Sequence, residues 1–517
     1  MRAGADGDAT GRNWTDAFPT LEGVTNLYVI GNLPNTYHEI WIAGRIERVG
    51  SMDKIQPQGP LAVRGGFTGA ENSAAERPAD SVSRIDGGLA NDCLRIKSGA
   101  GISAERLSFE RGSPIGFRKE GSGDLSVRNC RFLGNKRGSH HSWAFDVGWG
   151  SGLGIDGGDA SATQIAISNC VFCGNGFVGD SFAEKGAGVY ISGAKSASID
   201  DCLFVTNGVR WTLGIGNYGD NTESYGAALY AENAQVAARN CRFIANATQE
   251  KGGGAVRIAG ASGGSSFVNC LWSGNNDSWH NLYSKIEGDL THSGALVVAL
   301  SQSNQTVAVT NCTIAYNFGD RTLSAGGLLV EKGTAIIENS ILFGNSGGFQ
   351  LAAGVGCDLA LSSADAHAVV RYSLLSGLDS CPASSVVPEN LSTNAADGVV
   401  FADPKFVTGL DTVTNLIGDV GQASGYRHRG FKSGSLDAVM AFNLHLRGGT
   451  GFEDETTGGV VRDWTRRRYG NSPAIDAGDP AVKCVEPHPN GNRVNLGAYG
   501  NTPWATMSKG GTLIFVR

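Results

Sequence analysis

The chain has 517 residues with 76 glycines and only 14 prolines, and its formal net charge is −7 at pH 7. Charged residues make up 18% and aromatic residues 8% of the chain, which argues against disorder and indicates an ordered protein rich in tight turns. The acidic balance and the absence of long Lys/Arg runs argue against nucleic acid and anionic membranes as partners, and no apolar run is long enough for a transmembrane segment.

Residues 1–90 are expected to form N-terminal capping strands and a first coil. Short apolar runs between glycine-containing turns predict strands at Tyr28–Gly31, Glu39–Gly44 and Leu61–Phe67. A stack of repeats needs such a cap, because its first strand would otherwise expose an edge and the apolar interior. No signal peptide is recognisable at the start of the chain, and we interpret it as already removed.

One short phrase recurs between Asn129 and Asn345, and an internal repeat of this kind dictates the fold. Each copy opens with Asn or Asp followed by Cys or Ser, has a large apolar residue two positions later, and closes with Asn three positions after that. The first spacing is the strand period, so both side chains are expected to face the interior. The closing Asn is expected to adopt a left-handed turn, which Asn tolerates well. The copies open at Asn129, Asn169, Asp201, Asn240, Asn269, Asn311 and Asn339.

Two further strands belong to each repeat. One is entered through small residues, as in Gly186–Ile191 and Gly326–Val330, and a shorter one precedes each Cys, as in Ser196–Ile199. Three strands per turn, with like residues stacked from turn to turn, predict an all-β fold of the parallel β-helix type, with long lateral loops. Residues 91–380 are expected to form its regular coils.

The repeat also carries a family resemblance. Its alternation of Gly-Gly-Ala-aliphatic, as in Gly253–Val256, with Phe-x-x-Asn, as in Phe132–Asn135, resembles the repeat of the chlamydial polymorphic outer membrane proteins and of other exported bacterial β-helix proteins. The resemblance covers about residues 90–375. It implies a right-handed parallel β-helix and an extracellular or cell-surface location, but that fold hosts adhesins, lyases and structural surface proteins alike.

The chain has 11 cysteines, and their pattern is not that of a disulfide framework. The cysteines of the repeated phrase are expected to form an inward ladder of reduced, buried residues, which Ser340 continues. Cys357 and Cys381 lie outside this ladder and are the candidate disulfide pair. The ladder members are Cys130, Cys170, Cys202, Cys241, Cys270 and Cys312.

Insertions of different length separate each closing Asn from the next glycine-alanine strand. If the coils are in register, these insertions leave one corner and form a lateral wall across residues 136–292. They combine aromatic residues with carboxylates and amides, which suits the apolar faces and hydroxyl rims of sugars, so the expected partner is a polysaccharide. Alternatively, the aromatic residues only fold each loop onto the strands and cover them. The expected ligand-binding residues are Trp143, Trp149, Trp211, Tyr218, Glu223, Trp279, His280, Tyr283 and Lys285.

Two other functions stay open. A polysaccharide lyase or a glycoside hydrolase would use the same loops and place carboxylates across one cleft, with calcium as the cofactor of a lyase and otherwise none. A non-catalytic adhesin or structural surface protein would instead contact another surface protein through a flat wall. The pool for acid, base or metal roles is His141, Asp146, Asp180, Glu184, Arg210, Asp220, Glu223, Asp277, Lys285 and His292.

Short motifs do not strengthen the enzyme alternatives. Asp200 and Asp201 resemble the paired aspartates of polygalacturonase-type hydrolases, but the companion segments of that family are missing and successive strand residues point to opposite faces. We therefore expect a turn-capping pair. The C-x-x-C spacing of Cys170 and Cys173 would turn the two sulfurs apart, so no metal site is expected.

Beyond residue 380 the repeat loosens, and residues 381–517 are expected to form irregular coils and a closing cap continuous with the same solenoid. Family members commonly carry an acidic residue after the final Tyr of the closing coil, whereas this chain has Gly500, so the resemblance implies only a structural role here. The segments that together look like that closing coil are Phe401–Val407, Asn443–Leu446, Asn471–Gly478 and Asn492–Tyr499.

Overall fold

The computed structural model divides into two compact units, which we call unit 1 and unit 2. Unit 1 comprises Met1–Ala237 and Cys241–Ser262, and unit 2 comprises Ala238–Asn240 and Gly263–Arg517. The predicted borders at residues 90 and 380 stay predictions. The structure describes residues 1–2, 5, 8, 13–24, 38–48, 55–137, 150–158, 162–177, 185–208, 225–248, 254–277, 293–319, 325–347, 358–376, 390–393, 397–409, 412–413, 417–419, 429–431, 436–448, 451–454, 460–461 and 471–508.

Strands dominate both units, and the strands of the repeats pair in parallel, so the all-β prediction is confirmed. The helical segments include η1 (Ala74–Glu76) in unit 1 and α3 (Leu436–Met440) in unit 2. Antiparallel pairing occurs in unit 2, where β37 (Ile417–Asp419) pairs with β38 (Arg429–Phe431) and β39 (Phe452–Glu453) pairs with β40 (Val460–Val461).

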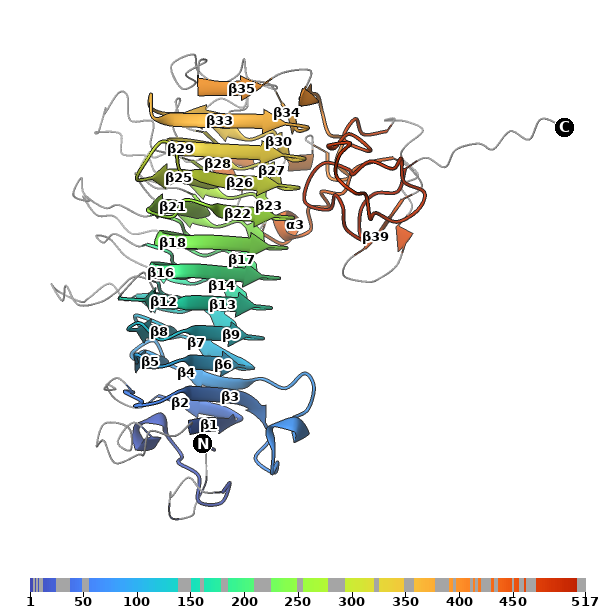
Figure 1. Cartoon of the computed structure of the whole chain (residues 1–517). Helices are drawn as coiled ribbons and strands as arrows, with labels where there is room; N and C mark the ends of the chain where they lie inside the picture. Colours follow the sequence, from blue (N-terminus) through green and yellow to red (C-terminus); the bar gives the residue numbers. More distant parts are fainter. Residues whose placement is uncertain are drawn as a thin grey trace. The chain divides into compact units, whose positions relative to one another are not determined.

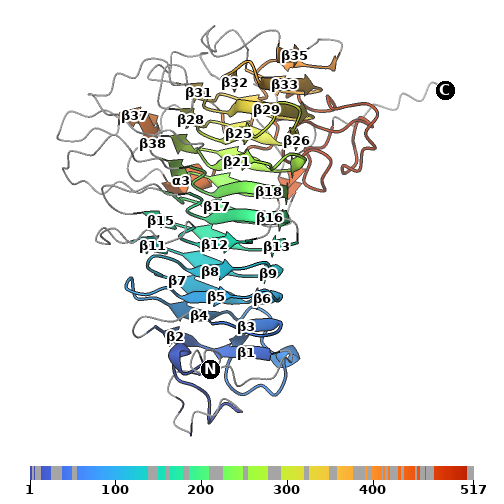
Figure 2. The ribbon, with the colours of Figure 1, turned by 60° about the vertical axis from the view of Figure 1, so that its left-hand side comes forward.

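Repeats of unit 1 contribute to two main parallel sheets, and Figure 1 shows the first-sheet strands of this unit one above another. The first sheet contains β1 (His38–Ala43), β3 (Leu61–Phe67), β5 (Leu94–Lys97), β6 (Ile102–Glu105), β8 (Phe117–Glu120), β9 (Leu125–Arg128), β12 (Leu153–Asp156), β13 (Gln164–Ser168), β16 (Val189–Asp200), β18 (Leu229–Arg239) and β21 (Val256–Gly260). The second contains β2 (Arg45–Glu47), β4 (Ser83–Asp86), β7 (Leu107–Glu110), β10 (Arg131–Leu133), β14 (Val171–Cys173), β17 (Leu203–Val205) and β19 (Arg242–Ile244). Short strands follow the second sheet, as Figure 2 shows for the first two, and they are β11 (Lys136–Arg137), β15 (Gly176–Phe177) and β20 (Ala247–Thr248).

Unit 2 repeats the scheme. Its first-sheet strands are β22 (Ser265–Val268), β25 (Leu296–Leu300), β26 (Thr306–Thr310), β29 (Leu328–Glu338), β32 (Leu359–Leu361), β33 (Ala366–Arg371) and β35 (Leu391–Thr393). Its second-sheet strands are β23 (Leu271–Ser273), β27 (Thr313–Ala315), β30 (Ile341–Phe343), β34 (Leu374–Leu375) and β36 (Val400–Phe401). The short strands are β24 (Asn276–Asp277), β28 (Phe318–Gly319) and β31 (Ser346–Gly347).

The large residue of the repeated phrase builds the core of unit 1. Phe132, Phe172 and Phe204 are paired in register across β10, β14 and β17, and their ring centroids lie 4.6 and 4.7 Å apart. Phe109 and Phe243 extend the stack at 4.9 Å on either side. Each buried Phe contributes about 1.5–3 kcal/mol, so this column is a main source of stability of the unit.

The predicted cysteine ladder is confirmed, since its members are buried and form no disulfide bonds. The sulfur of Cys170 donates to the carbonyl oxygen of Ser168 at 3.2 Å, and Cys130, Cys202, Cys270 and Cys312 repeat this contact two residues back along the chain. In unit 2 the hydroxyl of Ser340 donates to the Glu338 carbonyl at 2.8 Å, so Ser replaces Cys without losing the contact. The candidate pair Cys357 and Cys381 lies outside the described residues.

The role predicted for the closing Asn is wrong. The left-handed conformation belongs to the opening residue of the phrase, as in Asn169 with φ 50°, and to the residue before the closing Asn, as in Gly174 with φ 64°. The closing residues are buried instead and form an amide ladder: Asn175 Nδ2 donates to Asn207 Oδ1 at 2.9 Å and to the Phe132 carbonyl at 2.9 Å. An amide offers both a donor and an acceptor, so one residue type can repeat this pattern through a stack.

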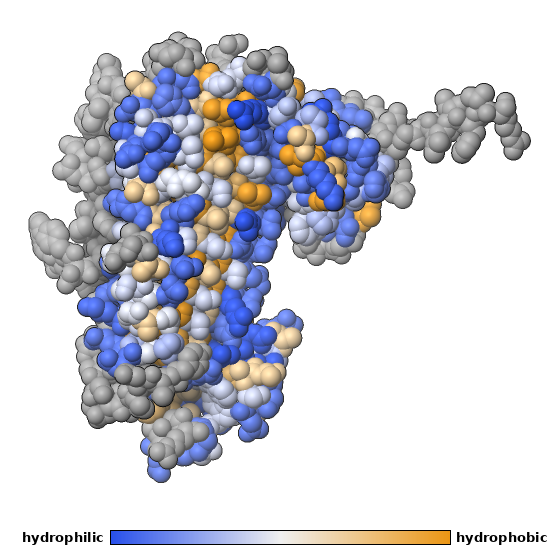
Figure 3. Space-filling model, viewed as in Figure 1, coloured by the Kyte–Doolittle hydropathy of each residue, from blue (hydrophilic) through white to orange (hydrophobic). Residues whose placement is uncertain are grey.

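In unit 2 the predicted closing segments lie together and pack against the repeats. Leu496 N–H donates to the Ala474 carbonyl at 3.0 Å, and His445 is stacked between Phe452 and Tyr499 at ring centroid distances of 3.9 and 3.7 Å. Figure 3 shows apolar side chains exposed among hydrophilic ones on the C-terminal segment of this unit. We call residues 471–508 the closing segment.

Candidate functional site

Most of the residues predicted to bind or act on a glycan lie outside the described residues. The exception is Asp277, whose backbone forms part of β24 and pairs with Gly319 of β28. The sites therefore stay predictions. Those outside the described residues are His141, Trp143, Asp146, Trp149, Asp180, Glu184, Arg210, Trp211, Tyr218, Asp220, Glu223, Trp279, His280, Tyr283, Lys285 and His292.

Two residues at the ends of the predicted loop wall are described, and both pack onto the strands of unit 1. Lys185 and Tyr225 form a parallel bridge, and the Lys185 ammonium lies 5.1 Å from the ring centroid of Tyr230 on β18. The Arg257 guanidinium lies 4.8 Å from the Tyr225 ring, and the Tyr190 and Tyr230 rings stack at 5.7 Å. At these loop ends the aromatic and basic residues pack on the strands, and both interpretations of the wall stay predictions.

The adjacent aspartates lie where β16 ends and the next turn begins. Asp201 is the opening residue of its repeat and has φ 53°, the same left-handed conformation as Asn129 and Asn169. Asp200 ends β16 and accepts a hydrogen bond from the Ser198 hydroxyl. The partner of the Asp200 carboxylate is thus a side-chain hydroxyl, and the turn-capping role of the pair stays a prediction.

A better-formed site lies near the start of unit 1, where residues 13–17 pack beside β1 and the turn after β3. A pocket of about 440 Å³ opens there, within the range of small-molecule sites in proteins. We call it the tryptophan pocket. It is lined by Met1, Asn13, Trp14, Ala17, Glu39, Trp41, Glu71 and Asn72.

The rings of Trp14 and Trp41 line the tryptophan pocket as an apolar wall, and the buried Phe67 ring packs against both. Trp41 stacks on Phe67 with centroids 4.7 Å apart and planes at 13°, while Trp14 is tilted against Phe67 at 5.5 Å and against Trp41 at 6.2 Å. Both indole N–H groups are used within the protein: Trp41 Nε1 donates to Glu39 Oε2 at 2.6 Å, and Trp14 Nε1 to the Glu71 carbonyl at 2.8 Å. These bonds fix the ring orientations, so the indole faces are what the wall presents to a ligand.

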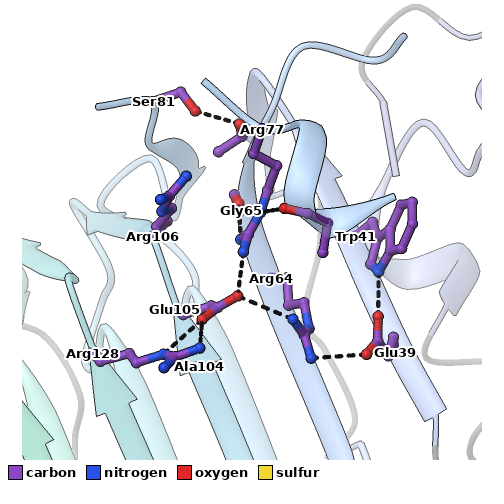
Figure 4. A network of polar contacts seen from close by, with 12 residues as sticks. Glu39, Trp41, Arg64, Gly65, Arg77, Ser81, Ala104, Glu105, Arg106 and Arg128 are labelled. Carbon is purple, nitrogen blue, oxygen red and sulfur yellow. Dashed lines mark hydrogen bonds and ion pairs between the residues drawn. The ribbon is translucent and has the colours of Figure 1, made fainter. Parts of the chain in front are cut away.

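A network of charged side chains supports this wall from β3 and β6, and Figure 4 shows it. Glu39 and Glu105 both contact the Arg64 guanidinium, at 2.9 and 3.4 Å. Glu105 also accepts hydrogen bonds from Arg77 at 2.6 Å and from Arg128 at 2.7 Å. Burial would raise the pKa of Glu105, but these two arginines outweigh it and lower that pKa, so the carboxylate stays charged.

Arg77 links the network to the aromatic wall, because its guanidinium carbon lies 5.1 Å from the Phe67 centroid while its nitrogens bind Glu105 and the Gly65 carbonyl. Pairs of this kind combine a cation–π contact with charge-assisted hydrogen bonds. Phe67 is thereby held from two directions, by Trp41 and by Arg77. The wall is preorganised, which lowers the entropy cost of binding a ligand.

Glu71 is the buried carboxylate of the pocket. Its oxygens accept hydrogen bonds from the backbone N–H and hydroxyl of Thr68 at 2.7 and 2.8 Å and from the N–H groups of Gly69 and Ala70 at 3.0 Å each. Burial acts to raise its pKa, but these donors lower the pKa to about 2. Glu71 is therefore an ionised hydrogen-bond acceptor at neutral pH and does not act as a proton donor.

The sequence interpretation missed this pocket, although it placed Trp41 and Phe67 in cap strands. The available signal was the one used for the loops, large aromatic residues near carboxylates and amides, and it occurs at Trp14, Glu39 and Asn72 as well. What the sequence could not give is the packing of residues 13–17 onto strands that follow much later in the chain.

Among the residues that the structure describes, no group of three or more His, Cys, Asp or Glu side chains is arranged to hold a metal ion. No helix in the described part of the chain has the length and apolar character needed to cross a membrane. Comparison with family models, with curated proteins and with solved structures gave no match to the chain.

Proposed function

We propose that this chain is an exported or cell-surface right-handed parallel β-helix protein that binds a polysaccharide, with the tryptophan pocket as one contact. The observation that carries the proposal is the fixed aromatic wall of Trp14 and Trp41 beside the amides and carboxylates of the pocket. Sugar rings bind such walls through their C–H faces, and their hydroxyl groups bond to polar groups at the edge. The β-helix and export proposals draw support from the parallel repeats and from the family resemblance.

The ring geometry favours a sugar over a cation. The two indole centroids are 6.2 Å apart, which places the rings in contact and leaves no gap between them for an ammonium group. Instead they form a tilted surface that a pyranose ring can cover. Both lining carboxylates already have partners within the protein, Glu39 in Arg64 and Glu71 in its four donors. A carboxylate accepts several hydrogen bonds and donates none, so towards a polar ligand both groups act as acceptors.

The same features favour binding over catalysis in this pocket. Glycoside hydrolysis needs one carboxylic acid that carries a proton and donates it to the leaving group. Glu71, with a pKa of about 2, is ionised at neutral pH and has no proton to donate. The lyase and hydrolase alternatives place their chemistry in the loops of residues 136–292, and they predict cleaved products.

The test is binding of the full chain to a panel of neutral and acidic polysaccharides, measured by calorimetry, with mass spectrometry of the same samples for products. We expect Trp41→Ala and Trp14→Ala each to weaken binding by about tenfold, which corresponds to about 1.4 kcal/mol. Trp504→Ala is the matched control, because Trp504 is also partly exposed but lies outside the pocket, in unit 2. Unchanged affinity in both pocket variants, or no binding across the panel, would contradict the proposal, and new oligosaccharides would turn it toward an enzyme.

A further inference from the structure

The opening residues of the repeated phrases form a column at one corner of each unit. Asn129 and Asn169 in unit 1, and Asn269, Asn311 and Asn339 in unit 2, all have φ between 49° and 54°. Asn is favoured there because it tolerates the left-handed conformation better than other residues with a side chain. The backbone thus places an amide side chain at the same corner of successive repeats.

In unit 2 this corner holds a turn of the closing segment, in which the Gly500 N–H donates to the Gly497 carbonyl at 2.9 Å. Asn269 Nδ2 donates to the carbonyl oxygens of Ala498 and Gly500 at 3.0 and 2.8 Å. Asn339 accepts the Asp479 N–H at its side-chain oxygen at 2.7 Å. Asn311 and Asn339 are only 6% and 3% exposed. The corner amides of unit 2 therefore recognise peptide backbone.

In unit 1 the same kind of corner is exposed. Asn129 and Asn169 are both exposed, and the Asn169 amide donates one hydrogen to Asn129 Oδ1 at 2.7 Å. An amide nitrogen carries two hydrogens, so the exposed Asn169 can donate a second hydrogen bond to a ligand. The amide donors of the corner are thus present in unit 1 as well, in an exposed position.

A groove of about 300 Å³ runs beside this exposed corner. Its lining includes both asparagines together with Ser81, Asp80, Arg106 and Arg131. Figure 4 labels Ser81 and Arg106 beside the charged network, Ser81 on the loop that follows Arg77 and Arg106 directly after β6. Arg106 donates to the Pro78 carbonyl at 3.0 Å, and Arg131 is exposed. These side chains carry two positive charges against one negative charge, which favours a ligand with a carboxylate.

We propose that this groove of unit 1 binds a peptide segment that carries a carboxylate. Its main-chain carbonyl oxygens accept hydrogen bonds from the amides of Asn129 and Asn169, as Ala498 and Gly500 do from Asn269 in unit 2, and its carboxylate faces Arg131. The occupant is a peptide because main-chain carbonyl oxygens are the acceptors that this corner already binds within the protein. The site is independent of the tryptophan pocket and of the proposed glycan.

The probes are two fluorescent peptides with capped ends. One has the sequence of residues 496–501, and the other has the same sequence with glutamate in the last position. We expect saturable binding of the acidic peptide to the full chain, measured by fluorescence anisotropy, and weaker binding of the neutral one. Arg131→Ala should reduce the affinity for the acidic peptide by about three- to tenfold and leave the neutral peptide nearly unchanged.

The decisive variant is Asn129→Gly combined with Asn169→Gly. Glycine accepts the φ values of 54° and 50° without strain, so the change removes the amides and keeps the turn. We expect at least about a tenfold loss of affinity for both peptides. Asn233→Gly is the matched control, because Asn233 also has φ 54° but lies outside the groove. It should leave binding intact.

Asn169→Asp offers a second variant if the double glycine variant fails to fold. Asp201 holds the equivalent position in the next repeat with φ 53°, so aspartate fits the turn while it removes the donor and adds a negative charge. We expect this variant to lose binding of the acidic peptide in particular. The proposal is overturned if the full chain shows no saturable binding of either peptide, or if the asparagine variants bind as the native protein does.

Discussion

Units 1 and 2 have the same pattern of buried residues, and they differ in what covers the corner residues of their repeats. Both contain the ladder of buried amides and the ladder of cysteine or serine, with the same hydrogen bonds. At the corner, however, Asn339 of unit 2 lies beneath the closing segment, while Asn169 of unit 1 is exposed. The repeat therefore sets the backbone and the interior, and segments outside the repeat decide which corner residues become part of the fold and which face ligands.

The largest effect is expected for the ladder of buried amides, which both units contain. Asn207 in unit 1 and Asn317 in unit 2 each donate to a neighbouring ladder residue at 2.9 Å and receive a bond from the preceding one. Replacing either with Leu leaves several buried polar groups without partners, and we expect a loss of about 3 kcal/mol in each case. Urea unfolding followed by hydrogen exchange of each unit measures this. A loss confined to one unit would show that the interiors are not equivalent.

A buried cation in unit 1 gives the next effect. Lys119 faces the interior on β8, between Ile96 and Ile155, and burial lowers its pKa to about 8 from the ordinary 10.5. Between these values the unfolded chain binds more protons than the folded one, so the free energy of unfolding should rise as pH increases from 8 to 10.5. Lys119→Met should abolish this rise and stabilise unit 1 by about 1–3 kcal/mol at pH 7. Arg118→Met changes a partly exposed neighbour and should keep the rise.

Unit 2 contains a buried acid with the opposite pH dependence. Burial raises the pKa of Asp358 to about 6 from 3.8, against the hydrogen bonds from Asn345 and Ser376 that lower it. The folded state therefore binds more protons between these pH values, and the free energy of unfolding should fall as pH increases from 4 to 6. In Asp358→Asn this fall of roughly 1–2 kcal/mol should be absent, which a pH series of urea unfolding curves can measure. Persistence of the full slope in the variant would assign it to another group.

The smallest effect addresses the corner itself. Asn339→Gly removes the acceptor of the Asp479 N–H from a buried contact in unit 2, and we expect a loss of about 1 kcal/mol. Asn169→Gly in unit 1 keeps the same turn and removes only an exposed bond, so the change should stay within about 0.5 kcal/mol. Thermal unfolding of the two variants compares them directly. Equal losses would mean that cover by the closing segment contributes nothing to stability.

The sequence predicted the all-β class, the parallel repeats and the cysteine ladder, because a spacing of two residues places Cys and the large residue on one face of any strand. The sequence did not show which asparagine of the phrase, the opening or the closing one, adopts the left-handed conformation. Both fit a left-handed turn equally well by residue type, and only the interior amide contacts show that the closing one is buried. A usable signal was present, since Gly134 and Gly174 directly precede the closing Asn and adopt the left-handed conformation.

The candidate sites were harder to predict, because they depend on contacts between distant parts of the chain. Trp14 bonds to the Glu71 carbonyl, and no periodic pattern connects these positions. The exposed corner of unit 1 has the same sequence pattern as the covered corner of unit 2, so only the position of the closing segment distinguishes them. The structure of the repeats can be predicted from their sequence pattern, whereas the position of segments outside the repeats is known only from the folded structure.

The amide ladder of unit 2 has a direction and an end. Each side-chain nitrogen from Asn275 to Asn317 to Asn345 donates to the oxygen of the next member, and the last oxygen belongs to Asp358. A carboxylate has no N–H to pass on, so the row of side-chain donors stops there. Asp358 thus fixes where the ladder ends. Whole repeats inserted or deleted before Asp358 would leave every ladder amide with a hydrogen-bond partner. A repeat added after Asp358 would need another residue that accepts the last hydrogen bond without donating one.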